Sequence, residues 1–74
     1  MAETPTLREF RESRGLAMDA LGILGQVDKS TISRIEAGRQ RPAPETVVRL
    51  ARALGISARR MQAICDASSN AGRP

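Results

Sequence analysis

The sequence predicts an all-α domain of five short helices, and three observations support this prediction. A chain of 74 residues is long enough for one small core, in which about 60% of the surface of the unfolded chain becomes buried. Its apolar residues recur at helical spacing, without the alternation typical of a half-buried strand. Glycines and prolines divide the chain into short segments at points where helices usually begin or end.

The first helix is expected from about Leu7 to Arg14. Thr6 and Glu9 have the spacing of a capping box, in which each side chain accepts a hydrogen bond from the backbone of the other residue. Gly15 can then adopt the left-handed conformation that ends many helices. The sequence therefore marks both ends of this helix.

The second helix is expected over residues 18–24, with Leu21 and Leu24 buried. Gly22 and Gly25 would allow another backbone segment to approach closely, although two glycines make the helix intrinsically weak. A brief connection then leads to the next helix.

The third helix is expected over residues 29–37, between the N-cap Asp28 and Gly38. On a helical wheel with about 100° per residue, one arc holds the residues that would face the core. These are Thr31, Ile32 and Ile35. The opposite arc holds hydrogen-bond donors, namely Lys29, Ser30, Ser33 and Arg34. Two isoleucines would thus anchor a helix whose donors face outward.

The fourth helix is expected to begin at Pro44, a residue that suits the first helical position. Its buried stripe follows from helical spacing and consists of Val47, Leu50, Ala51 and Leu54. Gly55 would end this helix, and a basic loop, "RQRPAP", precedes it.

The fifth helix is expected over residues 58–66, with Ser57 as its cap. Met61 and Ile64 share one face, which either closes the core or, with Ala63 and Cys65, binds another protein. We therefore divide the chain into a flexible arm (residues 1–5), one domain (6–66) and a disordered tail (67–74).

The composition favours a polyanionic partner and argues against catalysis. Twelve basic and eight acidic residues give a net charge of +4, which favours nucleic acid. Eleven of the twelve cations are arginine, a residue that suits phosphates and guanine edges, although a GC-rich genome would also encode it often. Histidine, tyrosine and tryptophan are absent, so the chain lacks a common general base and the aromatic platforms that stack single strands. We expect neither an enzyme nor a cofactor.

Cysteine content and hydropathy point to the cytoplasm. The single cysteine, Cys65, cannot form an intramolecular disulfide, and no Cys/His cluster suggests a metal site. The sequence contains neither an apolar run long enough to span a membrane nor a signal-peptide pattern. We therefore expect a cytoplasmic protein that packing alone stabilises.

Three stretches, in order, carry a resemblance to a known family. They are "LREFRESRGL" from Leu7, "ALGILGQVDKSTISRIEAG" from Ala20 and "RPAPETVVRLARALGIS" from Arg41. Over residues 7–61 the chain resembles the Cro and phage-repressor class of helix-turn-helix domains, also called the XRE family. The resemblance implies a compact five-helix, repressor-like fold in a bacterial or phage regulator associated with the nucleoid.

The resemblance also implies binding of double-stranded DNA, with the third helix in the major groove. The residues that would read base edges are Lys29, Ser30, Ser33 and Arg34. Those that would bind the DNA backbone are Thr31, Arg39, Gln40 and Arg41. Thr31 remains ambiguous, since its hydroxyl would reach a phosphate while its methyl packs inward, and residues 39–41 could equally form a solvated loop.

Two further expectations concern assembly and stability. Because one small domain touches few base pairs, we expect a homodimer on DNA, with an interface in the region of the fourth and fifth helices. The family often joins the positions of Arg11 and Glu36 by a salt bridge, which matters for stability only if it is buried. The same fold also serves as a protein-interaction module in antitoxins and coactivators, so a protein partner is the alternative to DNA.

The sequence departs from the family pattern at two positions. Met18 stands where a phosphate-binding glutamine usually begins the second helix, so backbone N–H groups would have to replace that contact. Gln26 replaces the usual glycine in the turn before the third helix. Either Gln26 adopts a left-handed conformation, or the turn shifts so that Gly25 does.

Overall fold

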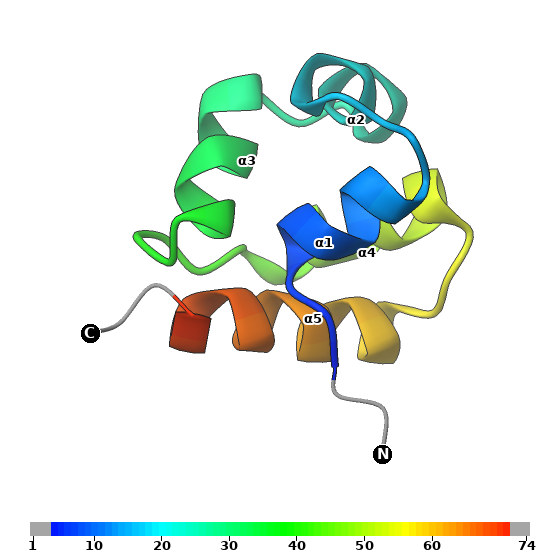
Figure 1. Cartoon of the computed structure of the whole chain (residues 1–74). Helices are drawn as coiled ribbons and strands as arrows, with labels where there is room; N and C mark the ends of the chain where they lie inside the picture. Colours follow the sequence, from blue (N-terminus) through cyan, green and yellow to red (C-terminus); the bar gives the residue numbers. More distant parts are fainter. Residues whose placement is uncertain (1–3, 72–74) are drawn as a thin grey trace.

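Five helices surround a single core in the computed structural model, which describes residues 4–71 (Figure 1). In chain order they are α1 (Leu7–Ser13), α2 (Met18–Gly25), α3 (Lys29–Glu36), α4 (Pro44–Leu54) and α5 (Ala58–Ala71). No strand occurs within these residues, which confirms the all-α prediction. None of the helices described is both long and apolar enough to cross a bilayer.

The predicted capping signals set the helix ends. Thr6 Oγ1 accepts a hydrogen bond from the Glu9 backbone N–H at 3.2 Å, and Glu9 Oε1 accepts one from the Thr6 N–H at 2.9 Å. Gly15, which follows the C-cap residue Arg14 of α1, has a φ of +69°. At the start of α5, Ser57 Oγ accepts from the Arg60 N–H at 3.1 Å. Asp28 occupies the N-cap of α3 as expected, but its side chain makes no capping hydrogen bond.

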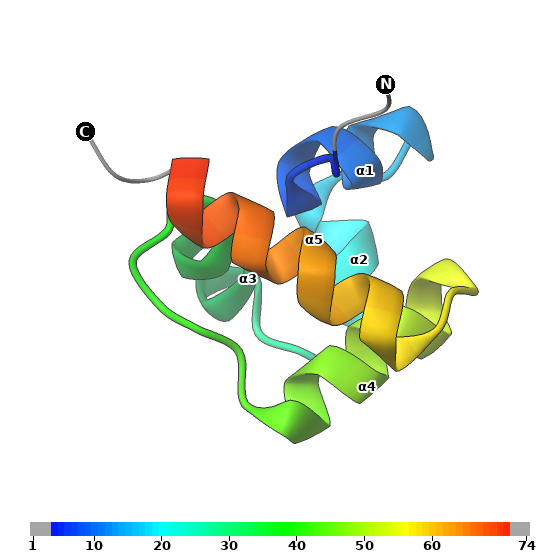
Figure 2. The same cartoon turned by 90° about the horizontal axis from the view of Figure 1, so that it is seen from below.

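Long α5 crosses beneath the other helices and contacts α1, α3 and α4 (Figure 2). The core combines residues from all five helices. Its members are Leu7, Phe10, Leu21, Ile32, Ile35, Val47, Leu50, Ala51, Leu54, Met61, Ile64 and Cys65. Met61 and Ile64 are fully buried, so they close the core, and the interpretation of this face as a protein-binding surface is wrong.

Two sequence-based expectations about the helices need correction. Leu24 is 57% exposed rather than buried, and Gly25 lies inside instead. The fifth helix continues to Ala71, so the disordered tail predicted from residue 67 is helical over residues 67–71, while residues 72–74 lie outside the described part. Ser68 explains the extension, because its buried Oγ accepts from the Leu7 N–H at 2.6 Å and ties α5 to α1. Residues 1–3 of the predicted arm also lie outside the described part.

Cys65 is a buried thiol in the core. Burial raises its pKa to about 11, and the charge of Asp66 adds to the shift. Because the unfolded thiol ionises first as the pH rises, the contribution of Cys65 to stability decreases between its ordinary pKa and about 11.

We expect thiol reagents near neutral pH to label Cys65 in the folded protein much more slowly than in the protein in denaturant. Equal labelling rates in the two states would contradict this placement.

Candidate nucleic-acid interface

Helices α2 and α3 approach each other through a tight turn that depends on Gly22. A Cβ atom at Gly22 would lie 2.7 Å from the carbonyl oxygen of Val27 and 3.6 Å from Ile32 Cδ1, so no other residue fits without a backbone shift. Gln26 adopts the left-handed conformation, with φ 56° and ψ 44°. This outcome decides between the two alternatives for the turn: Gln26, and not Gly25, takes the strained position. Its carbonyl oxygen accepts a hydrogen bond from Arg49 Nη1 at 3.3 Å.

Helix α3 has one buried and one exposed face. Ile32 and Ile35 retain 0% and 1% of their accessible surface and hold the helix against the core. The candidate base-reading residues are all exposed, and they are Lys29, Ser30, Ser33 and Arg34. Thr31 is half-buried at the edge between the two faces. In Figure 1, α3 lies at one side of the molecule.

Arg34 is held by a residue of the following loop. Its Nε donates to Gln40 Oε1 at 2.7 Å, which leaves both terminal guanidinium nitrogens available as a pair. Gln40 thus contacts Arg34, and the DNA-backbone role expected for Gln40 stays a prediction. Because the two residues are six positions apart and lie in different elements, no helical spacing suggests this contact.

Lys29 also has a partner that the sequence did not reveal. Its Nζ lies 2.8 Å from Asp19 Oδ1, at the start of α2. Both side chains are more than half exposed, so the pair fixes the lysine only loosely. Asp19 therefore lies beside the candidate site, although no sequence pattern indicated it.

The loop after α3 places further cations at the same edge of the molecule (Figure 1). It begins at Gly38, with φ +75°, and the Arg39 N–H donates to the Arg34 carbonyl at 2.9 Å. Arg39 and Arg41 are exposed and Gln40 is half-buried. Within residues 4–71 neither arginine forms an ion pair.

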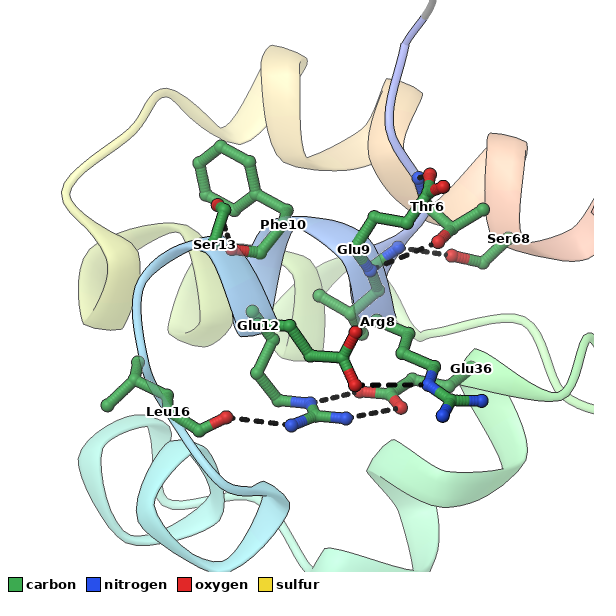
Figure 3. A network of polar contacts seen from close by, with 11 residues as sticks. Thr6, Arg8, Glu9, Phe10, Glu12, Ser13, Leu16, Glu36 and Ser68 are labelled. Atoms are coloured by element: carbon green, nitrogen blue, oxygen red, sulfur yellow. Dashed lines mark hydrogen bonds and ion pairs between the residues drawn. The ribbon is translucent and has the colours of Figure 1, made fainter.

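A buried ion pair fixes α3 relative to α1 (Figure 3). Arg11 Nε donates to Glu36 Oε2 at 2.7 Å, and Arg11 Nη2 donates to Glu36 Oε1 at 3.1 Å. A third bond runs from Arg11 Nη1 to the Leu16 carbonyl at 2.7 Å. The side chains of Arg11 and Glu36 are 9% and 7% exposed. Hydrogen bonding to Glu36 raises the pKa of the Arg11 guanidinium, against the smaller effect of burial.

Met18 does not replace the glutamine of the family pattern. It is half-buried and packs against the core. Ala17, the N-cap of α2, provides no side-chain hydrogen bond, so the first backbone N–H groups of α2 have no capping partner. Within residues 4–71, no group of three or more acidic, Cys or His side chains is arranged to hold a metal ion.

One comparison with known proteins identifies a family. A family model described as a helix-turn-helix domain matches residues 6–64, which is most of the chain. The same range contains α1 to α4 and the first half of α5. Searches of curated proteins and of solved structures found no significant match.

Proposed function

This chain belongs to the helix-turn-helix domain family, which points to DNA as its partner, and we propose that it is a sequence-specific transcriptional repressor. The two-faced α3 is the observation that carries the proposal. Two isoleucines fix the helix from behind, while an ammonium, a guanidinium and two hydroxyl groups project outward. Such a helix fits the width of the major groove and offers donors to the acceptors on base edges.

In this proposal Arg34 reads guanine. A guanidinium can donate two parallel hydrogen bonds to guanine O6 and N7. The contact with Gln40 engages Nε and leaves the two terminal nitrogens for that purpose. Lys29 donates to the same kind of acceptor, and Ser30 and Ser33 adapt to either base.

The phosphate contacts come from the surroundings of α3. Arg39 and Arg41 bind the DNA backbone from the loop, and the Thr31 hydroxyl reaches a phosphate from the edge of the helix. The uncapped N–H groups at the start of α2 replace the missing glutamine, because a helix N-terminus attracts phosphate. These contacts set the register of the protein on the duplex.

The functional unit in this proposal is a homodimer. One α3 touches few base pairs, so two copies would bind half-sites about 34 Å apart, one helical turn of DNA. The expected support from exposed Met61 and Ile64 is absent, since both are buried.

Salt titration on duplex DNA tests the proposed function. We expect the logarithm of the binding constant to decrease linearly with the logarithm of salt concentration, with a slope of about −0.9 per neutralised phosphate. Arg41→Ala should make this slope less steep by about one contact. A protein-interaction module would show no duplex binding above background at low salt, and that result would refute the proposal.

Base reading by Arg34 has a separate test. We expect Arg34→Ala to lose about 1 to 3 kcal/mol of binding free energy and to relax the preference at one base pair. Arg41→Ala is the matched control, because it removes another exposed arginine that should weaken all sequences alike. Selection of duplexes from a random pool supplies the sites for both variants. Equal losses on selected and scrambled sites for both variants would argue against direct reading.

A further inference from the structure

Three exposed apolar side chains lie on the neighbouring helices α2 and α4, and two of them, Leu24 and Val48, line one groove. Ile23 and Leu24 on α2 are 78% and 57% exposed, and Val48 on α4 is 38% exposed. Exposed apolar groups that lie together on a small protein mark contact surfaces. We call Ile23, Leu24 and Val48 the α2–α4 apolar surface.

Charges of opposite sign border this surface at its two ends. Ile23 lies at one end of the surface, in a groove that is also lined by two acidic residues and one basic residue, Asp19, Asp28 and Lys29. Leu24 and Val48 lie at the other end, in a second groove that is also lined by one acidic residue and two basic residues, Glu45, Arg49 and Arg52. One end is therefore acidic and the other basic.

Among the residues that the structure describes, one charge at each end has no ion-pair partner. Asp19 pairs with Lys29 at 2.8 Å, and Glu45 pairs with Arg49 at 2.7 Å. Asp28 and Arg52 form no ion pair with any residue between 4 and 71. Both are exposed, so each is available to another molecule.

We propose that the α2–α4 apolar surface binds a second copy of this chain around a two-fold axis. A two-fold contact joins the same surface of both molecules, so the acidic end of one copy meets the basic end of the other. Asp28 of each copy then faces Arg52 of the other, and the apolar side chains meet near the axis. Opposite charges at the two ends of one surface favour binding of a second copy, because each end then meets its opposite charge. Binding of an unrelated protein does not require such self-complementarity.

This inference deepens the proposed function, since it assigns the contact of the homodimer. Asp28 directly precedes α3, so the N-terminal ends of the two α3 helices lie on either side of the axis. The dimer contact thus uses α2 and α4, whereas the sequence pointed to the fourth and fifth helices.

Sedimentation of the free protein over a range of concentrations tests the contact without DNA. We expect the wild type to dimerise and Ile23→Asp to weaken dimerisation about tenfold or more, because it puts a charge into the apolar centre. Ala63→Asp is the matched control, since Ala63 is exposed on α5, and it should dimerise like the wild type. Circular dichroism checks that both variants are folded.

Mixing two charge variants tests the two-fold geometry. Asp28→Arg and Arg52→Asp should each dimerise poorly alone, because like charges then face each other twice. An equal mixture should regain dimers, because every contact in the mixed pair again joins opposite charges. A wild type that stays monomeric, an unaffected Ile23→Asp, or a mixture without recovery would each overturn the inference. Duplex binding is measured separately, so DNA binding by a monomer would refute this contact while leaving the DNA-binding function intact.

Discussion

Replacing Glu36 with glutamine is expected to lower the free energy of unfolding by about 3 kcal/mol. Loss of one member of a buried ion pair costs about 3 to 5 kcal/mol, and glutamine keeps one oxygen that can accept from Arg11. The cost arises because the Arg11 guanidinium stays charged and buried while its counter-charge disappears. Since a domain of this size has a stability of only about 4 to 11 kcal/mol, thermal or urea unfolding should detect the change easily.

Glu12→Gln provides the matched control for this prediction. Glu12 pairs with Arg8 at 3.2 Å, and both side chains are more than half exposed. An exposed pair contributes about 0 to 1 kcal/mol, so this variant should melt close to the wild type. If Glu36→Gln were as mild as Glu12→Gln, the buried pair would not be what fixes α3 to α1.

The helix boundaries were predictable because local signals determine them. The capping box of Thr6 and Glu9, the left-handed Gly15 and the first-position Pro44 all act within one helical turn. The buried stripe of α4 also followed from spacing alone, since the core lies along one side of that helix. Such features need no knowledge of the rest of the fold.

The corrections arise from contacts between distant segments. Leu24 is not in the core because Gly25, the next residue of α2, is the one that faces α4 and is buried. The end of α5 depends on Ser68 and Leu7, which are 61 residues apart in sequence. A polar, small-residue segment resembles a disordered tail until its tertiary partner is known.

The sequence predicted which face of α3 carries the candidate site, but it did not predict the contacts that the side chains of this face make. Helical spacing alone separated the two isoleucines of α3 from its exposed donors. Spacing gave no indication that Asp19 would hold Lys29 or that Gln40 would hold Arg34, because each pair joins different elements. The exposure of Ile23 was likewise not predictable, because the sequence of α2 resembles that of an ordinary amphipathic helix.

Replacing Ile32 with alanine is expected to lower the free energy of unfolding by about 2 to 5 kcal/mol. Ile32 is fully buried and packs beside Gly22, so the smaller side chain leaves a cavity where α3 meets α2. Since that contact fixes the outer face of α3, duplex affinity should decrease as well. Thermal unfolding and DNA titration of the same samples measure both effects.

Two control substitutions show whether the stability loss of Ile32→Ala comes from its anchoring role or whether any substitution in this region destabilises the domain. Ile23→Ala removes the same atoms from a side chain that is 78% exposed, and in dilute monomer it should change stability by about 0.5 kcal/mol or less. Ser33→Ala, next to Ile32 on the exposed face of α3, should also leave stability nearly unchanged. If Ser33→Ala destabilised the protein as much as Ile32→Ala, the outer face of α3 would be packed against the protein itself and could not bind DNA. The stability difference between these neighbouring residues therefore tests the orientation of α3 on which DNA recognition depends.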